Sequence, residues 1–250
     1  MATIRCQGQV FESIQAVLFD KDGTLANVEG YLKKLGFERS RLVAQQVPPT
    51  QAPVLETAIL AAFGLSAQRL DPAGLLAVGS RHDNEVAAAA CMAAIGWGWI
   101  AAVDSVKSAF TEAETLLGSK VSQTPLLPNV LPLLRALSSA NITVGIVSSD
   151  LHSEVAAFID YYQLPGIAWY CGASTAALPK THANFLKTAC AALSVPCVQT
   201  LIIGDSAADL GLANQGAAGF LGMTGGWQDP PVISATAITF VNLAQVEAFK

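Results

Sequence analysis

The chain has 250 residues, of which 52% are hydrophobic and 13% are charged, and its formal net charge at pH 7 is −5. Its length allows one large domain or a domain that carries a substantial insertion. The 19 acidic residues outnumber the 14 Lys and Arg residues. This balance argues against a nucleic-acid backbone as partner, because such binding requires clustered positive charge. Any phosphate group that the chain binds must therefore be held by a local site.

The cysteines and the first segment indicate a cytoplasmic protein. Five cysteines, at positions 6, 91, 171, 190 and 197, form no C-x-x-C pair and have no histidine at zinc-ligand spacing. This is typical of free thiols in a reducing compartment. The first 15 residues contain no uninterrupted apolar run of the kind that a signal peptide needs. We expect a monomer or a homodimer in the cytoplasm.

Residues 86–103 are 18 consecutive uncharged residues, a length at the lower limit for a membrane-spanning helix. Most of them are Ala and Gly, which contribute little transfer free energy, and Gly96 and Gly98 interrupt the run. We therefore predict two buried helices joined by a Gly-Trp-Gly turn, with Trp97 and Trp99 as packing groups, and no membrane partner. A membrane-anchored form is the alternative.

Short runs of β-branched or aromatic residues alternate with helical stretches, which is the pattern of a parallel α/β sheet. The first predicted strand is Ala16–Phe19. Residues 29–124 then contain no convincing strand, only helical segments divided by Pro and Gly residues. Further strands are predicted at Thr143–Val147, Ala168–Cys171, Thr200–Ile203, Gly219–Gly222 and Ile238–Val241. The helices between them include Val130–Leu137, Ser153–Tyr162 and Ala183–Leu193.

This pattern predicts two domains. Residues 1–28 and 125–250 form an α/β core, and residues 29–124 form an all-helical domain inserted into it. The return linker, residues 118–129, is rich in Ser, Gly and Pro. Two chain crossings then join the domains, and two crossings permit hinge motion.

Polar and charged residues stand where the predicted strands end. The segment VLFDKDGTL, residues 17–25, closes a buried strand with Asp20 and adds Asp22 two positions later. The next strand is followed by Ser148, Ser149 and Asp150, the third by Lys180, and the fourth by Asp205. Because the carboxyl ends of parallel strands meet at one edge of a sheet, where ligands bind, we expect these residues to converge.

Three carboxylates in such a cluster, Asp20, Asp205 and Asp209, would repel one another unless a hard divalent cation lies between them. Mg²⁺ suits one or two carboxylates, several waters and a phosphate oxygen of the substrate. A phosphate group is therefore the expected ligand, and Asp20 is placed to attack phosphorus and form an aspartyl-phosphate.

The other polar residues fit the remaining steps of such a reaction. Lys180, the hydroxyl of Ser148 and the backbone N–H groups after Asp20 suit the charge on the transferred phosphoryl group. Asp22 suits protonation of the leaving alkoxide and later deprotonation of the attacking water. Gly23 allows a tight turn beside the phosphate.

Each of these residues also has a purely structural alternative. The two acids of D-K-D-G-T can close a strand in an Asx-type turn. Ser148 or Asp205 can cap a helix, and Asp209 can serve the first turn of one. Lys180 can be a solvated surface lysine.

Together, VLFDKDGTL, GIVSSD, Lys180 and IIGDSAADLGLANQGAAG resemble the four motifs of the haloacid dehalogenase-like (HAD) hydrolase superfamily, in their usual order and with similar spacing. The resemblance covers the core and implies a Rossmann-like parallel sheet. The helical insertion falls where such proteins carry a cap domain of the C1 type. One departure is that Lys180 follows a proline, whereas many relatives have the proline after the lysine.

The resemblance also implies a role for each matching position. It implies Asp20 as the nucleophile, Asp22 as the acid/base, and Ser148 and Lys180 as phosphoryl binders. It implies Mg²⁺ as cofactor, with Asp205, Asp20 and the Asp22 carbonyl as ligands and Asp209 as a ligand directly or through water.

The order D-K-D-G-T favours phosphatases and phosphomutases, because dehalogenases lack the second aspartate and the related transporting ATPases read D-K-T-G-T. We predict a Mg²⁺-dependent phosphatase, similar to phosphoglycolate phosphatases and β-phosphoglucomutases, that hydrolyses a small phosphorylated metabolite. The alternatives are a phosphomutase and a non-catalytic phosphate-binding regulatory module.

The substrate-binding residues are the least defined part of this prediction. In the core we expect them to include Gly23, Thr24 and Ser149. In the inserted domain, Arg81 can read the far end of the substrate, together with His82. The alternative for Arg81 is a solvated loop that ends in a helix cap at Asp83 or Asn84.

Overall fold

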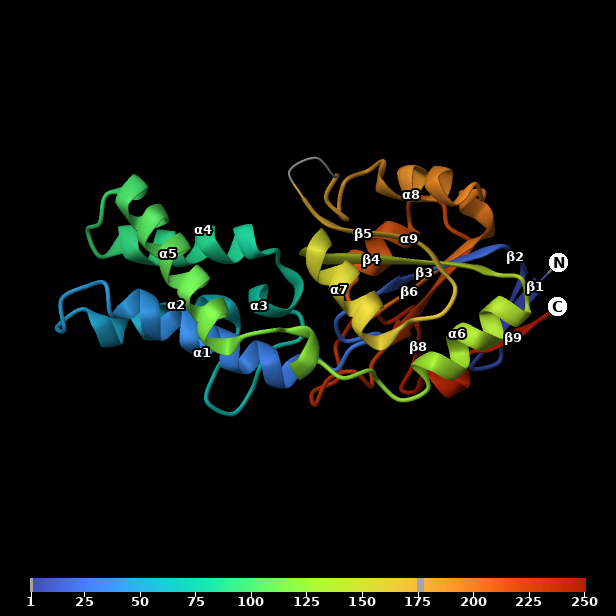
Figure 1. Cartoon of the computed structure of the whole chain (residues 1–250), viewed down its shortest axis with the longest axis horizontal. Coiled ribbons are helices and arrows are strands. Elements are labelled where there is room, and N and C mark those ends of the chain that lie inside the picture. The colour runs from blue at the N-terminus through green and yellow to red at the C-terminus, as the bar shows by residue number, and fades with distance from the viewer. Residues whose placement is uncertain (1, 175–177) are drawn as a thin grey trace. The chain divides into compact units, whose positions relative to one another are not determined.

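The computed structural model describes residues 2–174 and 178–250. The chain forms two compact units. We call Met1–Val28 with Thr124–Lys250 the core unit and Glu29–Gln123 the helical unit. Thr124 thus belongs to the core unit, whereas we expected it in the insertion. Figure 1 shows the strands in the core unit and helices in both units.

A six-stranded parallel sheet forms the centre of the core unit, in the order β5-β4-β3-β6-β7-β8. Its strands are β3 (Ala16–Asp20), β4 (Thr143–Leu151), β5 (Ile167–Ala173), β6 (Thr200–Gly204), β7 (Gly219–Met223) and β8 (Ile238–Phe240). Every residue of β3 and β6 is buried, as expected for central strands of a parallel sheet. The predicted parallel α/β core is confirmed, and each of the six predicted strands overlaps an observed one.

Helices cover this sheet. They are α6 (Val130–Ser139), α7 (His152–Tyr162), α8 (Phe185–Leu193) and α9 (Ala207–Ala213), with the short 3-10 helices η2 (Cys197–Gln199) and η3 (Leu243–Gln245). In Figure 1, α8 lies above the sheet and α6 lies below it. Leu186 of α8 shares one apolar cluster with Leu18 of β3 and Ile202 of β6. Apolar packing therefore holds the two strands that carry the acidic motifs.

A second, three-stranded antiparallel sheet was not predicted. It joins β1 (Ala2–Cys6) to β2 (Gln9–Ile14) and to β9 (Glu247–Phe249), so that the two ends of the chain lie side by side (Figure 1). Gln7 and Gly8 have φ angles of 50° and 79°, which suits a tight hairpin turn. This turn was a local signal for β1 and β2, whereas the pairing with β9 depends on the fold of the whole core unit.

The helical unit contains α1 (Glu29–Ala44), α2 (Ala52–Phe63), α3 (Leu75–Val78), α4 (Arg81–Ala94), α5 (Trp99–Leu117) and η1 (Val121–Gln123). All of its residues are described, and none of them lies in a strand. Gly64 ends α2 in the left-handed conformation, with φ of 71°, as glycine commonly does after a helix.

The apolar stretch 86–103 forms part of α4, a turn that contains Gly96, and the start of α5. Across the described ranges, no helix has both the length and the apolar character that a membrane crossing requires. Each of the two helices buries only one face. Trp99 is 51% exposed and Ile100 is 77% exposed, so the prediction of buried helices, with Trp99 as a packing group, is wrong at this turn.

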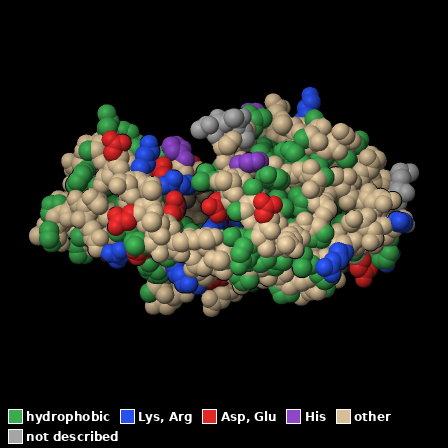
Figure 2. Space-filling model, in the orientation of Figure 1, with side chains coloured by type: hydrophobic (Ala, Val, Ile, Leu, Met, Phe, Trp, Pro, Cys, Tyr) green, Lys and Arg blue, Asp and Glu red, His purple; other side chains and the backbone are tan. Residues whose placement is uncertain are grey.

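Charged side chains are sparse on the molecular surface. Figure 2 shows them singly or in small groups among neutral and apolar atoms on the visible face, in agreement with a charged fraction of 13%. Two lysines are instead buried in the core unit, where Lys21 is 2% exposed and Lys180 is 8% exposed. Because a buried ammonium group requires a partner, each of these lysines indicates a polar site.

Candidate active site

Asp20 is the last residue of the central strand β3 and pairs in register with Val147 of β4. The chain then turns sharply, because the backbone N–H groups of Leu25 and Ala26 both donate to the carbonyl of Lys21. Gly23 has φ of +82°, and a Cβ at this position would collide with the side chains of Asp205 and Trp227. The turn therefore requires glycine, as we expected, and it brings the D-K-D-G-T loop against the loop after β6.

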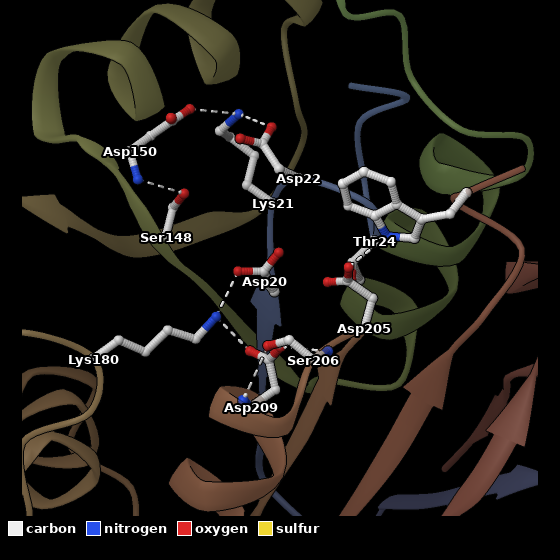
Figure 3. Close-up of polar contacts among 11 residues, drawn as sticks. Asp20, Lys21, Asp22, Thr24, Ser148, Asp150, Lys180, Asp205, Ser206 and Asp209 are labelled. Carbon is white, nitrogen blue, oxygen red and sulfur yellow. Dashed lines mark hydrogen bonds and ion pairs between the residues drawn. The ribbon is translucent and has the colours of Figure 1, made fainter. Parts of the chain in front are cut away.

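A buried ion-pair cluster surrounds Asp20 (Figure 3). The Lys180 ammonium group donates to Asp20 Oδ1 over 2.5 Å and also forms an ion pair with Asp209. Asp20 is 7% exposed and Asp209 is fully buried. Lys180 is thus not a surface lysine, and the structure brings it together with two of the three predicted acids.

The electrostatics of this cluster favour positive charge. Burial raises the pKa of Asp20 well above its usual value, Lys180 opposes that shift, and the charges of Asp209 and Asp205 add to it. Burial lowers the pKa of Lys180, but its two carboxylate partners outweigh this effect and raise it overall. The lysine therefore stays charged, and its charge offsets part of the cost of ionising the buried Asp20.

Asp205 follows β6 and is 4% exposed. The hydroxyl of Thr24 donates to its Oδ1 over 3.2 Å, and the indole N–H of Trp227 donates to its Oδ2 over 2.6 Å. Burial and the charge of Asp209 raise the pKa of Asp205 to about 7, whereas the Trp227 hydrogen bond opposes that shift. We expected Thr24 to bind substrate, whereas in the structure its hydroxyl group orients the Asp205 carboxylate.

Trp227 is a site residue that the sequence analysis missed. It is 7% exposed and lies in the loop after β7, at the same edge of the sheet as the other strand ends. A Cβ at the preceding Gly226 would collide with the carbonyl of Gly23, so this loop packs directly on the D-K-D-G-T turn. The sequence did contain a signal for Trp227, because the segment GGW follows a predicted strand. The carboxyl end of every strand in a parallel sheet lies at the edge where ligands bind.

Asp209 has two roles within the described structure. Its Oδ2 accepts hydrogen bonds from the backbone N–H and the hydroxyl of Ser206, which is the N-cap residue of α9. Its Oδ1 faces Lys180 in the ion pair, and among the described residues it has no partner with hydrogen-bond geometry. The structural alternative is therefore correct for one oxygen of Asp209. Ser206, and not Asp205, is the N-cap residue of α9, so the Asp205 side chain is available to the site.

Asp22 belongs to a second charge cluster. Lys21 forms ion pairs with Asp22 and, over 2.9 Å, with Asp150 near the carboxyl end of β4. Ser148, 8% exposed, accepts a hydrogen bond of 3.1 Å from the backbone N–H of Asp150. Figure 3 shows the side chain of Asp22 directed toward Lys21, whereas Asp20 is directed toward Lys180. The neighbouring Ser149 is half-buried.

Arg81 begins α4 of the helical unit, directly after the N-cap residue Ser80. Its guanidinium group pairs with Glu85 and Glu114 at 3.3 Å and 3.1 Å and donates to the hydroxyl of Thr111 over 3.0 Å. All of these partners lie in the helical unit. The role of Arg81 in substrate binding stays a prediction, and the expected cap at Asp83 or Asn84 is wrong, because Ser80 caps this helix.

The donor set of the core unit fits a hard divalent cation. Asp20, Asp205 and Asp209 are buried oxygen donors, and two of them have raised pKa values that a cation would lower. The fully buried Asp209 Oδ1 has no hydrogen bond from the described residues. Lys180 neutralises part of this charge, and the described ranges contain no three His, Cys, Asp or Glu side chains already arranged around one ion position.

The parallel sheet, with a buried aspartate and lysine at its carboxyl edge, defines this chain as a Rossmann-like α/β protein with a charged site at that edge. The model of the haloacid dehalogenase-like hydrolase family matches residues 14–216. The chain therefore belongs to the haloacid dehalogenase-like hydrolases. No curated protein shows significant sequence similarity to it.

Solved structures share this fold over nearly the whole chain. One is described as "a predicted phosphoglycolate phosphatase" from Haemophilus somnus, with 19% identity, a TM-score of 0.66 and coverage of 93% of this chain and 96% of that chain. A haloacid dehalogenase-like family hydrolase from Streptococcus pneumoniae has 18% identity, a TM-score of 0.55 and coverage of 93% and 96%. A dehalogenase has 18% identity, a TM-score of 0.55 and coverage of 93% and 95%. At these identities the likeness concerns the fold.

Proposed function

We propose that this hydrolase is a Mg²⁺-dependent phosphatase that cleaves the phosphate monoester of a small metabolite through an aspartyl-phosphate on Asp20. The observation that carries the proposal is the contact between Asp20 and Lys180 at the end of the central strand, 2.5 Å long and buried. A nucleophilic carboxylate and a cation for the phosphoryl oxygens thus adjoin each other. The second aspartate of D-K-D-G-T supplies the acid/base that a phosphatase needs.

Each residue has a defined task in this reaction. Asp20 attacks phosphorus, and the bond to the substrate oxygen breaks as Asp22 gives that oxygen a proton. Asp22 then removes a proton from water, which attacks phosphorus and releases Asp20. Lys180 and the Ser148 hydroxyl hold the phosphoryl oxygens during both transfers.

The metal would be held by the carboxylates of Asp20 and Asp205 and by the backbone carbonyl of Asp22, with Asp209 as a ligand directly or through water. When bound, Mg²⁺ would neutralise charge between the acids and the phosphate. Thr24 and Trp227 orient Asp205 through their hydrogen bonds. Their role is to hold that carboxylate in one position before metal and substrate arrive.

The test of this function is phosphate release from a panel of phosphate monoesters, with and without Mg²⁺. We choose phosphoglycolate as the first compound because the similar Haemophilus somnus structure is described as a predicted phosphoglycolate phosphatase. Sugar phosphates and an aryl phosphate follow. We expect Mg²⁺-dependent release that a chelator stops. A phosphomutase would instead release phosphate slowly and require a bisphosphate activator, and a regulatory module would bind phosphate without releasing any.

Replacing Trp227 with Phe is expected to weaken Mg²⁺ binding by ~10-fold to ~100-fold, as for other residues that orient a metal ligand. The substitution keeps a buried aromatic ring but removes the N–H that donates to Asp205. Calorimetric titration of the metal-free protein with Mg²⁺ measures this effect without turnover. Trp99→Phe, on the exposed turn of the helical unit, is the matched control, and equal dissociation constants for Trp227→Phe and wild type would contradict the role.

A further inference from the structure

Lys21 stands between the proposed nucleophile and the proposed acid/base, and the function assigned so far does not use it. Its side chain is 2% exposed, and its ammonium group lies 5.2 Å from the centre of the Phe158 ring of α7. Burial of an ammonium group is costly unless charged partners compensate for it. Here the compensation comes from Asp22 and Asp150.

The surroundings of Lys21 do not require a lysine for packing. Met or Leu at position 21 could cover the Phe158 ring equally well in this buried position. The side chains of Asp22 and Asp150 are 16% and 22% exposed, so water reaches both acids. The fold therefore does not need Lys21 to neutralise buried carboxylates, and the presence of a charged group there calls for another explanation.

The geometry supplies that explanation. Figure 3 shows the side chain of Lys21 directed away from Asp20 and Lys180 and toward the end of β4. There its ammonium group joins Asp22, in the loop after β3, to Asp150, at the end of β4. Asp150 is in turn fixed through its backbone N–H, which donates to Ser148. Lys21 thus connects the Asp22 carboxylate to the end of β4.

We propose that Lys21 is a positioning residue for the acid/base Asp22, held in place by Asp150. The proposal rests on the proposed phosphatase function. Transfer of a proton to the leaving oxygen requires the Asp22 carboxyl group in one orientation. Lys21 supplies that orientation and does not touch the phosphoryl group, whose charge is handled by Lys180.

This role has a signature that a general structural role lacks. A leaving alkoxide is strongly basic and needs the proton from Asp22, whereas a dinitrophenolate leaves without it. Loss of the positioning lysine therefore slows phosphoryl transfer to Asp20 much more from an alkyl phosphate than from dinitrophenyl phosphate. A change in phosphoryl binding or in overall folding would slow both substrates alike.

The experiment compares kcat/KM of wild type and Lys21→Met on both substrates. We expect kcat/KM for the alkyl phosphate to fall by ~10²-fold, in line with the size of general acid catalysis, and kcat/KM for dinitrophenyl phosphate to fall by no more than ~3-fold. This ratio covers the steps up to formation of the aspartyl-phosphate, whereas kcat also contains the later attack of water, in which Asp22 acts as the base for both substrates. Lys21→Arg should restore part of the alkyl activity. Lys187→Met, which alters an exposed lysine of α8, is the matched control with unchanged kinetics.

A double-mutant comparison isolates the pair. Adding Lys21→Met to Asp22→Asn should cause no further loss on the alkyl phosphate, because the group that Lys21 positions is already gone. If Lys21→Met does not fold, Asp150→Asn tests the same tie from its other end and should show a smaller loss with the same leaving-group dependence. Equal losses of kcat/KM on both substrates, or no loss, overturn the inference. A wild-type protein that cleaves neither ester overturns the phosphatase function instead.

Discussion

Asp20→Asn is expected to lower phosphate release by at least ~10³-fold, because an amide cannot form the aspartyl-phosphate on which turnover depends. The substitution is nearly isosteric, and it removes a buried carboxylate whose pKa is raised by burial. The fold should therefore persist, with Lys180 still paired to Asp209. The measurement is steady-state phosphate release with Mg²⁺, together with thermal unfolding of both proteins.

A matched control for this variant is Asp160→Asn, which makes the same chemical change at an exposed position of α7. The control should retain wild-type turnover. Hydrolysis by Asp20→Asn above a few per cent of the wild-type rate would show that another group attacks phosphorus. A variant that binds Mg²⁺ and orthophosphate but does not turn over would agree with the assignment.

Lys180→Met should have the second largest effect, and it should act on both activity and stability. The lysine bridges Asp20 and Asp209 inside the core unit, so its loss leaves two buried carboxylates without their partner. Removing one member of a buried ion pair costs about 3–5 kcal/mol of unfolding free energy. Loss of the cation for the phosphoryl oxygens should also lower kcat by ~10²-fold to ~10³-fold.

Denaturant unfolding and steady-state kinetics measure the two effects separately. Added Mg²⁺ should restore part of the lost stability, because a divalent cation also neutralises the acids, whereas kcat should stay low. Lys187→Met provides the surface comparison, since that side chain is exposed. Unchanged unfolding free energy in Lys180→Met would contradict the buried ion pairs, and unchanged kcat would contradict its catalytic role.

The sheet could be predicted because its signals are local. Each central strand is a short apolar run, and parallel strands share one carboxyl edge. The expectation that Asp20 and Lys180 meet followed from that rule, although 160 positions separate them. The antiparallel sheet was missed because β9 can pair with β1 only after the core unit has brought both ends of the chain together. The exposure of Trp99 was missed for a related reason, since periodicity shows an apolar face but not which neighbour covers it.

Within the site, sequence patterns identified the residue types and the structure determined their partners. Motif spacing pointed to Asp20, Asp205 and Asp209, but not to the indole of Trp227 as a donor to Asp205. The contact of Asp209 with the N-cap residue Ser206 had a local signal that was missed, because Ser-x-x-Asp is the order of a capping box. Motif spacing could not show that Asp22 pairs with Lys21, because side-chain direction depends on packing around the turn.

The amino-acid sequence by itself determined the family, the parallel core, the helical insertion and the sheet edge at which the acidic motifs gather. These follow from residue order, periodicity and the common direction of parallel strands. Only the tertiary structure decided which charges neutralise one another. Lys180 forms ion pairs with Asp20 and Asp209, and Lys21 forms ion pairs with Asp22 and Asp150. The physical reason is that ion pairs and hydrogen bonds act over a few ångströms, and such distances between remote residues exist only once the chain is folded.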